Sequence, residues 1–179
     1  MKREAAKRLK ELVHAKKVEI EEKLNELFLA VFLMGAGGKG LEERRRLENL
    51  LEERGIIAIV AEDDLPRDVA PSLVEEYVLS SSEVELAFVN VESWGSAAEF
   101  VQYHENPSVA PKLRVLVESK HHPLYGRERG YLTDLYLTHL AVYGHVYAYG
   151  KKPFPSSAEI VVKLAERYKQ WRALKLRRN

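Results

Sequence analysis

The residue best placed to do chemistry in this chain is a glutamate at the start of a predicted helix. Residues 84–100 read VELAFVNVESWGSAAEF: an apolar run ends at Glu92-Ser93-Trp94-Gly95, and a helical pattern opens at Ser96. We interpret this stretch as a buried strand, a tight turn and a helix start, with Glu99 on the first helical turn. A carboxylate there could act on a sugar, because glycosidic cleavage passes through an oxocarbenium-like state that a carboxylate stabilises.

A structural role for Glu99 competes with this chemical one. Ser96-x-x-Glu99 fits a capping box, in which the serine side chain accepts a hydrogen bond from the third helical amide and the glutamate reaches back to the cap amide. The spacing alone favours the cap, since short motifs often occur by chance.

The wider sequence favours the chemical role through a resemblance. Residues 89–100, VNVESWGSAAEF, are similar to the "ESPGSxAELG" segment of the nucleoside deoxyribosyltransferase-like and TIR-like superfamily. Weaker similarity covers about residues 27–150, including Phe32-Leu33-Met34-Gly35 and Ala61-Glu62-Asp63-Asp64. The resemblance implies that Glu99 attacks the anomeric carbon of a nucleoside or nicotinamide nucleotide, or stabilises the cation formed there. It also implies a flavodoxin-like strand order, 2-1-3-4-5.

A glycine-rich turn follows the first predicted strand, residues 27–34. It matches G-x-G-x-x-G, a pattern that lets backbone amides approach a phosphate closely. It is not a Walker A loop, because Lys39 is followed by glycine rather than serine or threonine. The alternative is a flexible loop over the pocket mouth. The candidate binding residues here are Gly35, Gly37, Gly38 and Lys39.

Other candidate binding residues follow the second and third predicted strands. Asp63, after residues 56–61, is a candidate ligand of ribose hydroxyls. Glu92, Ser93, Gly95 and Ser96, with the nearby amides, are candidates for orienting a sugar or phosphate. The crevice above strands 1 and 3 would bring these groups to Glu99. Adjacent His121 and His122 lack a spaced third ligand, so no metal site is predicted.

Composition limits the broad class of the protein. The 179 residues suffice for one domain with a substantial core, and a net charge of +1 does not indicate a nucleic-acid binder. There is no cysteine, which rules out disulfides and thiolate sites, and no apolar run is long enough to span a membrane. We expect a cytoplasmic protein. Its high content of charged residues, 31%, is typical of a thermophile.

Residues 2–26 predict an amphipathic helix ahead of the domain, with uneven charge. Residues 2–17 carry seven Lys or Arg against two Glu, whereas residues 19–26 carry four Glu and one Lys. One interpretation is a solvated face on a helix packed against its own sheet. The other is antiparallel pairing with a second copy, basic end against acidic end, which would make a homodimer.

Five predicted strands alternate with helices, so we predict a single Rossmann-like α/β domain with a five-stranded parallel sheet. The N-terminal helix would cover residues 1–26 and the deoxyribosyltransferase-like domain residues 27–179. The predicted function is cleavage or transfer at an N-glycosidic bond of a deoxynucleoside or of NAD, with Glu99 catalytic. No cofactor is needed, and NAD enters only as a substrate. The alternatives are a non-catalytic nucleotide-sensing module and, ranked last, a dinucleotide-dependent oxidoreductase.

Overall fold

The structure is a computed structural model that describes residues 2–150 and 153–175. Its sheet has five strands, all parallel, in the order β2-β1-β3-β4-β5. This confirms the predicted Rossmann-like α/β fold and its strand order. The order reverses between β1 and β3, and ligands of open α/β sheets bind at such a switch point. The strands are β1 (Ala30–Met34), β2 (Ile57–Val60), β3 (Val84–Asn90), β4 (Leu113–Glu118) and β5 (Val146–Tyr149).

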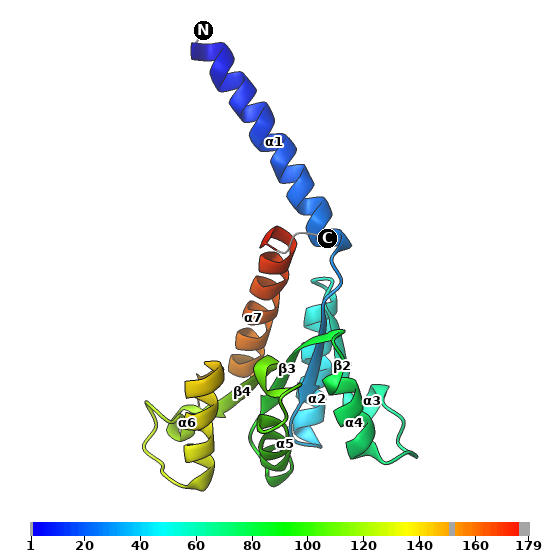
Figure 1. Cartoon of the computed structure of the whole chain (residues 1–179), viewed down its shortest axis with the longest axis vertical. Coiled ribbons are helices and arrows are strands. Elements are labelled where there is room, and N and C mark those ends of the chain that lie inside the picture. The colour runs from blue at the N-terminus through cyan, green and yellow to red at the C-terminus, as the bar shows by residue number, and fades with distance from the viewer. Residues whose placement is uncertain (1, 151–152, 176–179) are drawn as a thin grey trace.

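Helices cover both faces of the sheet, so the central strands are buried on both sides and read as continuous apolar runs. Packed against one face are α2 and α7, and against the other are α4, α5 and α6 (Figure 1). The helices are α1 (Lys2–Glu26), α2 (Lys39–Glu52), α3 (Ala61–Asp64), α4 (Pro71–Ser80), α5 (Trp94–His104), α6 (Tyr131–Tyr143) and α7 (Pro153–Lys175), with 3-10 turns η1 (Ala110–Lys112) and η2 (Ser119–His121).

Helix α7 begins before the capping box that its sequence suggests. Ser156-x-x-Glu159 predicts a start at Ser156, but the helix begins at Pro153, three residues earlier. Proline favours the first helical turn, because its fixed φ suits a helix and its missing N–H would have no partner there. Ser157 consequently lies inside the helix, where it is buried.

Helix α1 is present as predicted, but it does not lie on the sheet. It extends away from the α/β body as a long arm, and its contacts with the body are mainly with α7 (Figure 1). None of the described helices combines the length and the apolar composition that crossing a bilayer requires.

Candidate active site

The cavity that contains Glu99 lies at the carboxyl ends of β1 and β2, between α2, α4 and α5. Its volume is about 530 Å³, within the range of small-molecule sites. Glu99 enters it from α5, Glu75 from α4 and Arg44 from α2. The remaining lining residues are Leu33, Met34, Gly35, Leu41, Ala61, Glu62, Leu65, Pro66, Arg67 and Pro71.

The expected capping box of Ser96 and Glu99 is wrong. Helix α5 begins one turn earlier than predicted, with Ser93 as its N-cap residue and Ser96 at the third helical position. The Ser96 amide donates to Ser93 Oγ at 3.2 Å, and the Ser93 amide donates to Ser96 Oγ at 3.0 Å. The two serines thus satisfy the helix start between themselves, and Glu99 lies beyond it, at the sixth helical position.

The Glu99 carboxyl group is in an unusual environment for an acid. The side chain is half-buried, and its Oε2 atom is buried with no hydrogen-bond partner among the described residues. Desolvation, followed by repulsion from Glu75, raises the pKa of Glu99 to about 8. A glutamate with an unperturbed pKa is ionised at neutral pH. The raised pKa of Glu99 instead favours its protonated form at neutral pH.

Glu75 is a second carboxylate of the cavity, and sequence reasoning missed it. Tyr103 Oη donates a hydrogen bond to Glu75 Oε1 at 2.8 Å. Burial raises the pKa of Glu75 as well, although the bond from Tyr103 opposes that shift. The carboxyl groups of Glu75 and Glu99 therefore repel each other when charged, and the first to ionise disfavours ionisation of the second.

Arg44 is the buried cation of the cavity, and it was also missed. Its Nη1 donates to the carbonyl oxygen of Ala36 at 2.8 Å, and its Nη2 pairs with Glu62. Its Nε has no hydrogen-bond partner among the residues that the structure describes. The guanidinium lies so close to Gly35 that a Cβ atom there would be 2.8 Å from Arg44 Nη1. A side chain at position 35 would therefore displace the guanidinium from the position in which it bonds to Ala36 and Glu62.

Asp63 points away from the cavity. It forms a bidentate pair with Arg45, with Arg45 Nε and Nη2 at 2.7 and 2.6 Å from its two oxygens. The bond from Arg45 lowers the pKa of Asp63, so this residue is ionised and engaged on the surface. The neighbouring Glu62 lines the cavity instead. The acidic stretch after β2 therefore does reach the site, but through a different residue from the predicted one.

The exposed part of the glycine-rich turn does not line the cavity. Gly37, Gly38 and Lys39 are exposed, and Lys39 already belongs to α2, where it lies 4.0 Å from Glu43. Gly38 is the N-cap residue with φ of 57°, a conformation that favours glycine. Of the predicted binding residues in this turn, only Gly35 is among those lining the large cavity.

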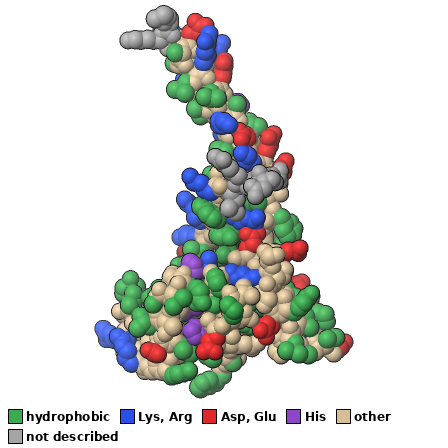
Figure 2. All heavy atoms as spheres, viewed as in Figure 1, with side chains coloured by type: hydrophobic (Ala, Val, Ile, Leu, Met, Phe, Trp, Pro, Cys, Tyr) green, Lys and Arg blue, Asp and Glu red, His purple; other side chains and the backbone are tan. Residues whose placement is uncertain are grey.

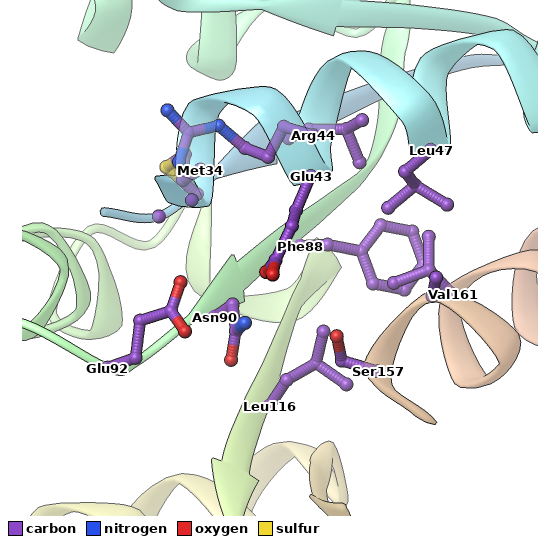
Figure 3. Close-up of a pocket in the computed structure, with 14 residues that line it drawn as sticks. Met34, Glu43, Arg44, Leu47, Phe88, Asn90, Glu92, Leu116, Ser157 and Val161 are labelled. Atoms are coloured by element: carbon purple, nitrogen blue, oxygen red, sulfur yellow. The ribbon is translucent and has the colours of Figure 1, made fainter. Parts of the chain in front are cut away.

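Glu92 lines a smaller cavity on the other side of Arg44, facing α2 and α7. Figure 3 shows Glu43, Asn90, Glu92 and Ser157 pointing into this space. Desolvation, followed by repulsion from Glu43, raises the pKa of Glu92. The volume is about 30 Å³, room for about one water molecule, so a nucleoside does not fit there.

A third cavity, of about 500 Å³, lies beyond the start of α5 at the ends of β3, β4 and β5. Glu92, Ser93 and the almost fully exposed Trp94 line it, together with Lys120 and His121. Gly95 is exposed in the first turn of α5, and Ser96 is buried in the cap. The predicted binding residues around the start of α5 therefore lie on a different side of the helix from the cavity of Glu99.

The paired histidines have structural partners. His121 Nδ1 lies 2.8 Å from Glu128 Oε2, and His122 is buried and stacked on Tyr125 with ring centroids 4.7 Å apart. Within residues 2–150 and 153–175, no group of three or more histidine, aspartate or glutamate side chains is arranged to hold a metal ion. Tyr131 is exposed at the start of α6.

Both missed residues occupy positions that their helices would normally give to apolar side chains. Arg44 lies three residues before Leu47 and seven before Leu51, which are buried on the same face of α2. Glu75 lies four residues before Leu79, the buried residue of α4. A charged residue on the same helix face as buried leucines was the sequence signal that could have identified these two residues.

No protein-family model matches this chain, and no curated protein matches it either.

Proposed function

We propose that the protein cleaves or transfers the N-glycosidic bond of a nucleoside or nucleotide, with Glu99 as the catalytic carboxylate. The observation that carries the proposal is the Glu99 carboxyl group itself. It lies in a cavity of small-molecule size, has a buried oxygen without a partner in the described structure, and takes no part in capping α5. A buried polar atom left unpaired costs stability, so it points to a functional role.

The cavity supplies the other groups that this chemistry needs. Its apolar wall, which includes Leu33, Met34 and Leu65, suits a base, and Arg44 and Arg67 offer donors to hydroxyl or phosphate oxygens. In the transition state the sugar becomes cationic, and this positive charge favours the ionised form of Glu99. The negative charge of Glu99 in turn stabilises the cationic sugar. In the empty cavity, desolvation disfavours that same charge.

The proposal is tested by mass-spectrometric product analysis with deoxynucleosides, nucleotides and NAD. Free base should appear with the wild-type protein, and Glu99→Gln should lower its rate of formation by about a thousand-fold or more, because glutamine cannot serve as a nucleophile. Glu105→Gln is the matched control, since Glu105 is exposed at the end of the same helix. Equal turnover by the wild-type protein and Glu99→Gln would contradict the assignment.

The pH dependence of kcat/KM tests the protonation state separately. If ionised Glu99 is the active form, kcat/KM should rise with pH and level off above about 8, the pKa of Glu99. Glu75→Gln should move the midpoint to lower pH, because it removes the repulsion that helps to raise the pKa of Glu99. A rate that falls through this pH range would make Glu99 a general acid instead.

A second candidate function is a nucleotide-sensing module without turnover. The raised pKa of Glu99 favours it, since a protonated carboxyl group is a poor nucleophile but a good hydrogen-bond donor to a base or hydroxyl. In that case ligands bind to the wild-type protein, no product forms at any pH, and Glu99→Gln retains much of the binding because glutamine also donates.

A further inference from the structure

The arm formed by α1 has an apolar stripe that the rest of the chain leaves largely uncovered. Leu9 and Val13 are each 60% exposed, and Ala6 is exposed as well. Figure 2 shows hydrophobic side chains along this arm, between basic and acidic ones. A lone helix in water gains little from its own backbone bonds, because helices in proteins are stabilised mainly by packing of an apolar face. Packing of this apolar face against another surface would therefore stabilise α1.

The spacing of the residues in this apolar stripe is symmetric about its midpoint. Its members are spaced 3, 4, 7, 4 and 3 residues apart, about a midpoint between Lys16 and Lys17, and are Ala6, Leu9, Val13, Ile20, Leu24 and Leu27. At about 100° per residue all six lie within an arc of roughly 60°. A second copy laid antiparallel, with a twofold axis at the midpoint, therefore places Leu9 opposite Leu24 and Val13 opposite Ile20.

We propose that two copies of this chain associate through α1 as an antiparallel pair. Charge supports this direction, because residues 7–14 of one copy, with three Lys or Arg and one Glu, then lie along the acidic residues 19–26 of the other. The like charges at the midpoint are already matched within each helix: Lys16 lies 2.5 Å from Glu19, and Lys17 lies 3.7 Å from Glu21. In a parallel pair, basic ends would face each other.

Helix α7 extends the surface that the partner would cover. It packs beside the last turns of α1, where Ile20 and Leu24 are only half-buried, and its own Trp171 and Leu174 are 47% and 53% exposed. The first half of the partner's α1 would lie against exposed apolar side chains of both helices. The interface lies where α1 leads into β1, at the opposite end of the strands from the cavity of Glu99.

Light scattering tests the association. The wild-type mass should be about twice the 20.5 kDa of the chain, and the dissociation constant should rise with salt, since screening weakens the paired charges. The double variant Leu9→Gln/Val13→Gln should be monomeric. Val18→Gln is the matched control, because Val18 lies about 150° around the helix from the stripe. A monomer at every salt and protein concentration overturns the proposal.

Disulfide formation tests the direction, in a chain that contains no cysteine of its own. Mixing Leu9→Cys with Leu24→Cys should give a cross-linked heterodimer on oxidation, because only an antiparallel pair brings these positions within the short Cβ separation that a disulfide requires. Leu9→Cys alone should not cross-link. Efficient cross-linking of Leu9→Cys to itself would instead show parallel helices and overturn the proposal. The α1 interface is distant from the cavity of Glu99, so we expect turnover to be the same in monomer and dimer. A failure of association and a failure of turnover would therefore be separate results.

Discussion

Replacing Glu99 by glutamine should stabilise the folded protein above pH 8 while leaving its stability near pH 4 almost unchanged. The pKa of Glu99 is raised from 4.5 to about 8, so the folded state binds a proton that the unfolded chain releases at lower pH. The stability that this gives is fully present below pH 4.5 and is lost as the pH rises through about 8. Glutamine stays neutral and loses nothing.

The expected gain at pH 9 is of the order of 3 kcal/mol. A full conversion of the shift at about 1.4 kcal/mol for each pH unit would give more, but the cavity is open to solvent, which lowers the cost of the charge. Urea unfolding of the wild-type protein, Glu99→Gln and Glu105→Gln at pH 5, 7 and 9, at one protein concentration, measures it. A difference between wild type and Glu99→Gln that is the same at all three pH values would contradict the burial of this group.

Replacing Arg44 by methionine should destabilise the protein by about 2 to 4 kcal/mol. Methionine fills much of the same space, but it leaves the carbonyl oxygen of Ala36 without its donor and Glu62 without its counter-ion. The cost stays moderate because the Glu62 side chain is 37% exposed and water can solvate it.

Arg45→Met is the matched control for this change. Arg45 is the next residue of α2 and also pairs with an acid of α3, Asp63, but on the surface, where such pairs contribute about 1 kcal/mol or less. Urea unfolding of both variants compares a buried with an exposed pair on the same helix. Equal losses for the two would contradict the structural role of Arg44. Arg44→Met should also raise the pKa of Glu99 further, since Arg44 opposes the shift.

The alternation of strands and helices could be predicted because each element has a local signal in the sequence, whereas the strand order was an expectation from the family resemblance. The run of residues 84–90 is apolar enough for a strand buried on both faces, and Pro71 and Gly144 are local signals for the start of α4 and the end of α6. What sequence could not give was which of two overlapping serine patterns starts α5. Ser93-x-x-Ser96 and Ser96-x-x-Glu99 both fit a capped helix, and the choice depends on where β3 ends.

The candidate site was predicted only in its centre. Glu99 does lie in a cavity at the predicted end of the sheet, but Glu75 and Arg44 arrive there on α4 and α2, far away in the sequence. A charge in register with buried positions marks these residues as unusual, but their place in the site depends on how helices on opposite faces of the sheet reach its edge. The prediction named Asp63 rather than Glu62 because it did not include the one-turn helix α3. This helix rotates the acidic stretch after β2, so that Glu62 faces the cavity.

The contact between Gly35 and Arg44 also limits how this sequence can change. A Cβ atom at position 35 would lie 2.8 Å from Arg44 Nη1, so a larger residue there must either move the guanidinium away from Ala36 and Glu62 or be matched by a shorter residue at position 44. A shorter residue at 44 in turn removes the partner of Glu62. Positions 35, 44 and 62 should therefore vary as a group among relatives of this protein, and a change at one of them alone should be rare.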